Sequence, residues 1–165
     1  MNKLAEILPT DNIVVLDQAS SKKRVFEQAS LLLESRLKIA RSKIFNALFS
    51  REKLGSTGLG SGIAIPHGRV DGIKRAHALF FSLTKPIPFD ANDGEPVDLL
   101  IFLLVPLNSN DEHLKILSEI ANMLSSEDFV CLLRKTSSPS EMHEIICSWE
   151  LSLPEVRLKD NAQGK

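Results

Sequence analysis

The sequence lacks an excess of charge of either sign. It has 20 Lys and Arg residues against 21 Asp and Glu residues, so the formal net charge at pH 7 is −1. Nucleic-acid binders usually carry a basic excess that neutralises phosphates, so this composition argues against such a function. The 165 residues make up one ordinary domain, which is long enough to bury a core without disulfides or metals.

Long hydrophobic runs are also missing. The longest apolar stretch, Val97 to Pro106, is interrupted by Asp98 and falls short of the roughly 20 residues that a membrane-spanning helix needs. The N-terminus places Glu6 early and shows no apolar region of a signal peptide. We therefore expect a cytoplasmic protein that does not insert into a membrane.

Cysteine is scarce. Cys131 and Cys147 lie far apart, and both fall in expected helices. Because this spacing fits neither a disulfide framework nor a metal-binding pair, we expect two buried free thiols in a reducing cytosol.

Common catalytic and cofactor-binding motifs are absent as well. The chain has no G-x-x-x-x-G-K-[ST] segment, which excludes a P-loop, and no G-x-S-x-G elbow. The glycines at 58, 60 and 62 do not have the dinucleotide-binding spacing. His143 to Cys147 resembles the H-E-x-x-H motif, but no third metal ligand is evident. We expect no metal and no cofactor.

Helical patterns occur at both ends of the chain, with strands between them. The expected helices are 4–8, a long one capped by Ser20 or Ser21, 42–53, one capped by Asn110, 128–135 and 139–150. The expected strands are 12–16, 63–65, 76–84 and 97–105. The two longest strands are almost continuously apolar, which indicates interior positions. This order predicts an α/β fold, a single-domain sandwich whose mixed, mostly parallel β-sheet has helices on both faces.

The most informative segment runs from Arg51 to Arg69, where a glycine-rich loop leads into Ile-Pro-His-Gly-Arg. A phosphohistidine site needs a neutral imidazole with one free nitrogen, a rigid mount and donors for the phosphoryl oxygens. Pro66 restricts the backbone before His67. Gly68 leaves space beside the ring, which would let a partner's backbone approach. His67 is therefore the candidate phosphoryl acceptor.

Several polar groups are candidates for holding an anion beside this histidine. Ser56 and Thr57 offer hydroxyls within the glycine-rich loop, and Gly68 and the loop glycines offer unobstructed amides. Arg51 could supply a guanidinium group, and so could Arg69. His113 would lie in the first turn of its helix, where the helix dipole favours a nearby phosphate.

These residues also have simpler structural interpretations. His67 could be a structural histidine in a tight turn, His113 could bond to its own helix start, and Arg51 could be a solvated charge. The glycine-rich loop could be a connector. We expect His77, which opens a strand, to be structural, and His143 to lie on a solvated helix face.

The segment from Leu54 to Gly68, with its Gly-Ser-Thr-Gly and Gly-Ile-Ala-Ile-Pro-His-Gly sequences, resembles a known family. It is similar to the enzyme IIA domain of the mannitol/fructose class of the phosphoenolpyruvate-dependent phosphotransferase system. The similarity continues through residues 87–90, 96–100 and 104–106 and the His113 helix, and covers about residues 4–150. The loop looks most like the nitrogen-related branch, the standalone regulatory enzyme IIA.

This resemblance implies a phosphotransferase component that accepts a phosphoryl group on His67, through Nε2, from a phosphorylated HPr-like carrier protein. His113 would be the second active-site histidine, and Arg51 would help to hold the phosphoryl group. No metal or nucleotide would be required. In this branch the phosphorylation state regulates partner proteins, including potassium-transport and sensor components.

Two other functions stay open. The chain could be a sugar-specific enzyme IIA that passes the phosphoryl group to a separate IIB protein and permease, or a binding module that does not use phosphorylation. The enzyme IIA domain is expected to span residues 1–152. Residues 153–165 are expected to form a polar, flexible tail.

Overall fold

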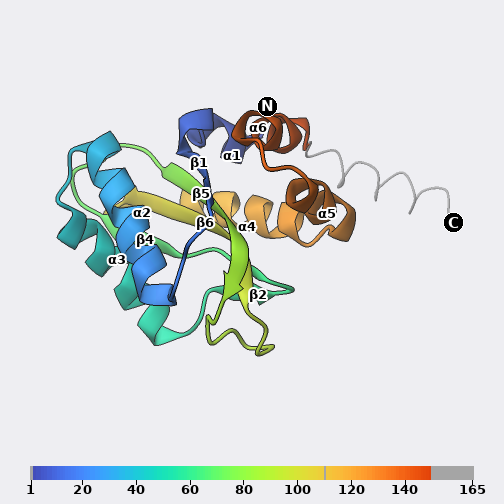
Figure 1. The fold of residues 1–165 in the computed structure, drawn as a ribbon. Helices are drawn as coiled ribbons and strands as arrows, with labels where there is room; N and C mark the ends of the chain where they lie inside the picture. Colours follow the sequence, from blue (N-terminus) through green and yellow to red (C-terminus); the bar gives the residue numbers. More distant parts are fainter. Residues whose placement is uncertain (1, 110, 150–165) are drawn as a thin grey trace, which may run out of the picture.

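The computed structural model describes residues 2–109 and 111–149 (Figure 1). Its helices are α1 (Lys3–Ile7), α2 (Lys22–Leu37), α3 (Arg41–Leu54), α4 (Asp111–Leu124), α5 (Glu127–Lys135) and α6 (Pro139–Ser148), with a 3-10 turn at Thr10–Asn12. Its strands are β1 (Ile13–Leu16), β2 (Gly58–Gly60), β3 (Ile63–Ala64), β4 (His67–Val70), β5 (His77–Ile87) and β6 (Val97–Pro106). The expected cap Asn110 and the expected tail 153–165 lie outside the described residues.

The strands form one mixed sheet. Its order is β1-β5-β6-β3-β2, and β4 also pairs with β6. The β1–β5, β3–β6 and β4–β6 pairings are parallel, whereas the β5–β6 and β2–β3 pairings are antiparallel. The predicted fold class is therefore confirmed, although the longest ladder, between β5 and β6, is antiparallel.

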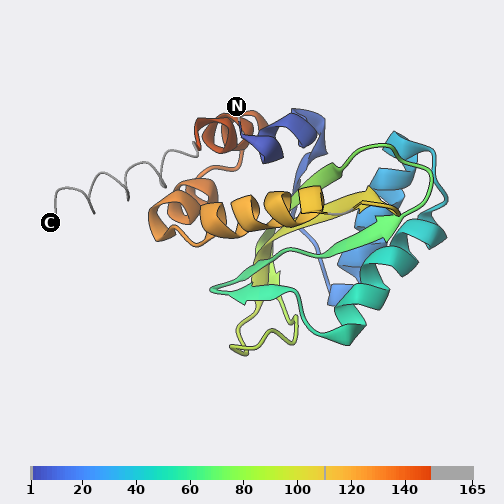
Figure 2. The same cartoon turned by 180° about the vertical axis from the view of Figure 1, so that it is seen from behind.

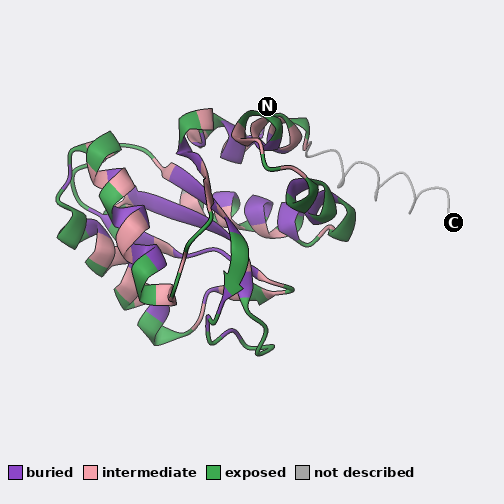
Figure 3. Ribbon diagram, viewed as in Figure 1, coloured by how far each residue is buried: buried purple, intermediate pink, exposed green. Residues whose placement is uncertain are grey.

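Helices cover both faces of this sheet (Figures 1 and 2). One core contains residues of α2 and α3, and the other contains residues of α1, α4, α5 and α6. Successive side chains of a strand point to opposite faces, so Phe80 packs into the second core and Phe81 into the first. β6 and the first half of β5 are buried on both faces, which explains the continuous apolar sequences there, whereas the later part of β5 is mostly exposed (Figure 3).

The glycine-rich segment contains a strand that the sequence analysis assigned to a loop. β2 and β3 form a hairpin whose turn residues, Ser61 and Gly62, have φ angles of 57° and 84°. Two consecutive positive φ angles suit the twist of a two-residue hairpin, and glycine adopts them without steric cost. Gly62 therefore supplies the backbone conformation that this turn requires.

The candidate histidine lies on a strand that the sequence analysis also missed. β3 and β4 run one after the other along β6 and are separated by Ile65 and Pro66. The Pro66 carbonyl accepts a hydrogen bond from Leu103 N at 2.9 Å, and β4 then resumes the ladder with His67 opposite Leu103. Pro66 thus interrupts the strand without ending it, because its carbonyl can still join the ladder.

The two cysteines are free, but the expectation that both are buried is wrong. Cys131 on α5 is exposed, and Cys147 on α6 is half-buried. The amphipathic pattern of α5 assigns Phe129, Val130 and Leu133 to the core, which turns Cys131 toward solvent.

Candidate functional site

His67 lines a cavity of about 380 Å³ at the surface between α3, β4, β6 and the start of α4. Four side chains that the sequence analysis singled out line it together: Arg51, His67, Arg69 and His113. These residues come from three separate parts of the chain, and the sheet brings them together. The proximity of Arg51 and His113 to His67, which the sequence could only suggest, is therefore present in the folded chain.

His67 is held by its own backbone neighbourhood. Its Nδ1 lies 2.9 Å from the Ile65 carbonyl oxygen. A carbonyl oxygen can only accept, so Nδ1 must carry the proton of this hydrogen bond. In the neutral ring the other nitrogen, Nε2, then has a free electron pair.

The surroundings of His67 favour its neutral form. Burial lowers its pKa below the ordinary value of 6.5, although the hydrogen bond to Ile65 opposes this shift. The nearby charges of Arg51 and His113 lower the pKa further, whereas Glu52 raises it. A lowered pKa favours the neutral ring, which is the state a nitrogen nucleophile requires.

Arg51 stands in the last turn of α3. Its Nη1 donates a 2.8 Å hydrogen bond to the Gly55 carbonyl, just beyond the end of the helix. This contact holds the Arg51 guanidinium in place. Arg51 lines the same cavity as His67, and its charge lowers the pKa of His67. The remaining guanidinium donors are suited to an anion in that cavity.

Arg69 links β4 to the start of α4. Since side chains alternate along a strand, Arg69 and His67 lie on the same, outward face of β4. The Arg69 guanidinium donates to the Ser109 carbonyl, and its Nη2 lies 3.4 Å from Nε2 of His113. Nδ1 of His113 lies 3.5 Å from the Ser109 hydroxyl. Arg69 therefore helps to orient the second histidine, a role that the sequence analysis did not anticipate.

Ser56 and Thr57 do not line this cavity. The Thr57 hydroxyl and amide both bind the Glu52 carboxylate, and the Ser56 hydroxyl accepts a 3.1 Å hydrogen bond from Gly58 N. Glu52 is 4% exposed and also forms a 2.7 Å ion pair with Lys22. Thr57 thus holds the loop to α3, and Ser56 stabilises the loop itself, which agrees with the connector interpretation considered above.

Gly68 is required for packing, and the expectation that it leaves space for a partner's backbone is wrong. A Cβ at this position would lie 2.5 Å from the backbone oxygen of Ala47 on α3. The missing side chain therefore lets α3 approach β4, and it does not open space for a partner protein. Because α3 also carries Arg51, this close approach sets the distance between the arginine and His67.

The other histidines lie elsewhere. His77 is half-buried at the start of β5, where burial and then the charge of Arg75 lower its pKa. His143 lies 3.6 Å from the Cys147 sulfur, through its Nδ1, one turn away on α6. Among residues 2–109 and 111–149, no three His, Cys, Asp or Glu side chains are grouped to hold a metal ion.

Three exposed leucines belong to the segments that line the cavity or adjoin those segments in the sequence. Leu54, at the end of α3, is 86% exposed and contributes to the cavity wall. Leu107 and Leu114 are 59% and 55% exposed, on either side of the segment that carries Ser109 and His113. Apolar side chains that gather around a polar site are typical of a surface that a partner protein covers.

Comparisons with known proteins identify relatives of the whole domain. Residues 6–149 match the family described as "Phosphoenolpyruvate-dependent sugar phosphotransferase system, EIIA 2". The chain is 42% identical over 147 residues to a nitrogen regulatory protein of Pseudomonas aeruginosa, covering 88% of this chain and 96% of that protein. It is 44% identical over 131 residues to a nitrogen regulatory protein of Escherichia coli, covering 79% and 80%.

A solved structure is also similar to this chain. The nitrogen regulatory protein IIA-Ntr from Neisseria meningitidis has a TM-score of 0.82 and 48% sequence identity, covering 87% of this chain and 99% of that chain. In the part of this chain that the structure describes, none of the helices is long and apolar enough to cross a membrane. The chain therefore belongs to the EIIA 2 family of the phosphoenolpyruvate-dependent phosphotransferase system, and it is similar to the nitrogen regulatory proteins of that family.

Proposed function

We propose that this protein is a phosphohistidine carrier whose His67 accepts a phosphoryl group on Nε2 from a phosphorylated HPr-like carrier protein. The observation that carries the proposal is the hydrogen bond from Nδ1 of His67 to the Ile65 carbonyl. It fixes the tautomer, holds the ring and leaves Nε2 as the nucleophile. Family membership supports the same chemistry.

Phosphoryl transfer from the donor to His67 needs neither a metal ion nor an added proton. The Nε2 electron pair attacks phosphorus, the N–P bond of the donor phosphohistidine breaks, and its electron pair returns to the donor's imidazole. Because Nδ1 keeps its proton, the phosphorylated ring of His67 carries positive charge. The Ile65 carbonyl stabilises that charge through the hydrogen bond already present.

Two cationic groups are available for the phosphoryl oxygens. Arg51 lines the cavity from α3, and Arg69 lines it from β4. His113, on the α4 side, can donate a hydrogen bond from one ring nitrogen once the group arrives. Phosphoryl transfer depends mainly on positioning and on such charge stabilisation, so preformed donors at three sides suit it.

The exposed leucines give the donor a docking surface. Leu54 lines the cavity, and Leu107 and Leu114 are exposed next to the segment that carries Ser109 and His113. Exposed apolar side chains of this kind are typical of surfaces that a partner protein covers. We expect the carrier to cover these leucines while its phosphohistidine reaches into the cavity. The same surface would be offered to regulatory partners.

The output is regulatory. A phosphoryl group adds between 1 and 2 negative charges, roughly, at pH 7, which changes the charge of this surface and hence the partners it binds. Potassium-transport or sensor components are candidate targets, and the cytoplasm is the compartment in which such a relay would operate. The nitrogen regulatory relatives favour this output over onward transfer to a sugar permease.

The test uses the full-length protein with phosphoenolpyruvate, enzyme I and the carrier, followed by intact mass measurement. The proposal predicts one acid-labile phosphoryl group on the wild type and on the control His143→Ala, and none on His67→Ala. A His67→Ala protein that still gains the group would overturn the assignment. A folded wild type that gains nothing from any carrier would favour the binding-module alternative.

A further inference from the structure

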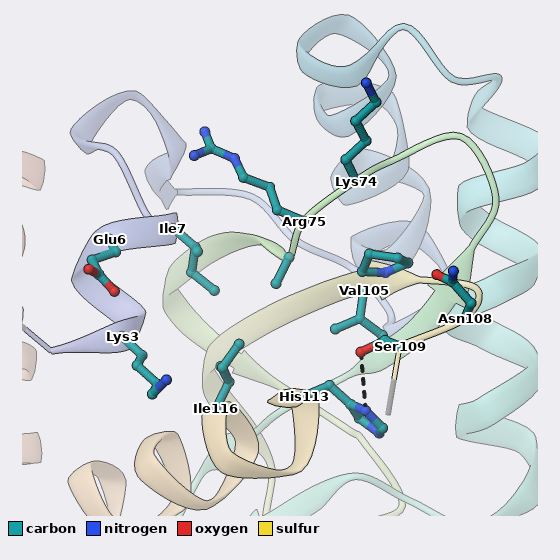
Figure 4. Close-up of a pocket in the computed structure, with 12 residues that line it drawn as sticks. Lys3, Glu6, Ile7, Lys74, Arg75, Val105, Asn108, Ser109, His113 and Ile116 are labelled. Atoms are coloured by element: carbon teal, nitrogen blue, oxygen red, sulfur yellow. Dashed lines mark hydrogen bonds between the residues drawn. The ribbon is translucent and has the colours of Figure 1, made fainter. Parts of the chain in front are cut away.

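A second cavity, of about 330 Å³, lies behind His113 (Figure 4). It is bounded by α1, the loop before β5 and the segment that leads into α4. Its apolar wall includes Val105 and Ile116, which are 3% and 5% exposed, together with Ile7. Ile7 and Ile116 do not line the His67 cavity, whereas Val105 and His113 line both cavities and Ser109 borders this second one.

Cations surround this apolar wall. Lys3 extends from α1, and Lys74 and Arg75 extend from the loop on the other side, with Ile7 between Lys3 and Arg75 in Figure 4. Glu6 is the one carboxylate among the lining residues. In the described part of the chain, no ion pair within 4.0 Å involves these three cations, so their charges are available to a ligand.

We propose that this cavity binds a small aliphatic dicarboxylate and that the bound dianion slows phosphoryl transfer to His67. The planar fork of Arg75 suits one carboxylate, Lys3 suits the other, and the aliphatic chain would lie on Val105 and Ile116. Inorganic phosphate would bind weakly, because it has no apolar part to cover this wall.

The coupling follows from the position of His113 and rests on the proposed phosphocarrier function. His113 borders both cavities, and its Nδ1 lies 3.5 Å from the Ser109 hydroxyl, as the dashed line in Figure 4 marks. A carboxylate beside Ser109 and His113 would compete for their hydrogen bonds and would add negative charge next to the phosphoryl site. Both effects oppose the arrival of a dianionic group.

The binding test is an NMR titration of the full-length protein with glutarate. The expected Kd is below about 1 mM. Arg75→Gln and Lys3→Gln should each weaken binding about tenfold, because each removes a charge-assisted hydrogen bond. The matched control Lys43→Gln, an exposed cation on α3, should bind as the wild type does. The neutral isostere glutaramide and inorganic phosphate should bind at least tenfold more weakly than glutarate.

The coupling test measures the initial rate of phosphoryl gain from pre-phosphorylated carrier. Saturating glutarate should lower the rate about fivefold in the wild type, and the ratio with and without glutarate should return to about one in Arg75→Gln. Equal binding to Arg75→Gln and Lys43→Gln, equal binding of glutaramide, or binding without a change in rate would each overturn the inference. A wild type that gains no phosphoryl group even without glutarate would refute the proposed function instead, and the titration would still decide whether the cavity binds the dianion.

Discussion

Gly68→Ala isolates the contact that brings α3 against β4. The new Cβ would lie 2.5 Å from the Ala47 carbonyl oxygen and 2.8 Å from the Ala47 carbonyl carbon. Both are backbone atoms within a helix and cannot rotate away. Ordinary contact begins at 3.4 Å, so α3 and β4 must separate by about 0.9 Å at this point.

The expected cost of this separation is about 2 kcal/mol, within the usual range for overpacking a well-packed core. For a domain of this size, that corresponds to a fall of about 4–8 °C in the midpoint of thermal unfolding. Because α3 carries Arg51, the same shift should displace the arginine from His67. A displacement of that size at a reacting centre lowers the rate of phosphoryl gain by about tenfold or more.

The assays are thermal unfolding by circular dichroism and the initial rate of phosphoryl gain. Gly55→Ala is the matched control, because nothing lies within 4 Å of the Cβ it would add. It should unfold within about 1 °C of the wild type, since open surface tolerates a methyl group. A Gly68→Ala protein as stable as Gly55→Ala would refute the packing explanation and restore the idea that this glycine serves partner access.

Three further predictions concern the charges around the site. Glu52→Ala should lower the free energy of unfolding by about 3 kcal/mol in urea, because it leaves a partly buried lysine without its partner. Arg51→Gln should raise the pKa of His67 toward 6.5, as an NMR titration would measure, since the arginine charge lowers it. The pKa of His67 is lower in the folded chain than in the unfolded chain. The contribution of His67 to stability is therefore present above pH 6.5 and is lost as the pH falls below 6.5. Arg51→Gln should reduce that loss of stability. Arg69→Gln should slow phosphoryl gain by about tenfold by freeing His113, with an unfolding midpoint within about 2 °C of the wild type because Arg69 is exposed.

Much of the fold could be predicted because periodicity and capping are local properties. Ser21 caps α2 as expected, and the apolar runs of β5 and β6 are central strands. β2 and β4 were missed because they are short, and because glycine and proline usually end strands. Their strand geometry depends on pairing with β3 and β6, which no local pattern encodes.

The residue types of the candidate site could be proposed from the sequence, whereas their arrangement could be proposed only in part. His67 could be singled out because Pro66 and Gly68 flank it. The functions of Thr57 and Arg69 could not be predicted, since they depend on contacts with Glu52 and with His113. The Arg69 contact joins residues on β4 and α4, which only the sheet brings together, and a sequence pattern does not report such a distance.

The central claim is that Nε2 of His67 receives the phosphoryl group. Long-range ¹H–¹⁵N NMR spectra of the histidine-labelled protein, recorded before and after phosphorylation, test it directly. We expect a protonated Nδ1 and an unprotonated Nε2 before the reaction, and phosphorus bonded to Nε2 of His67 afterwards. Phosphorus on Nδ1, or on any other histidine, would contradict it.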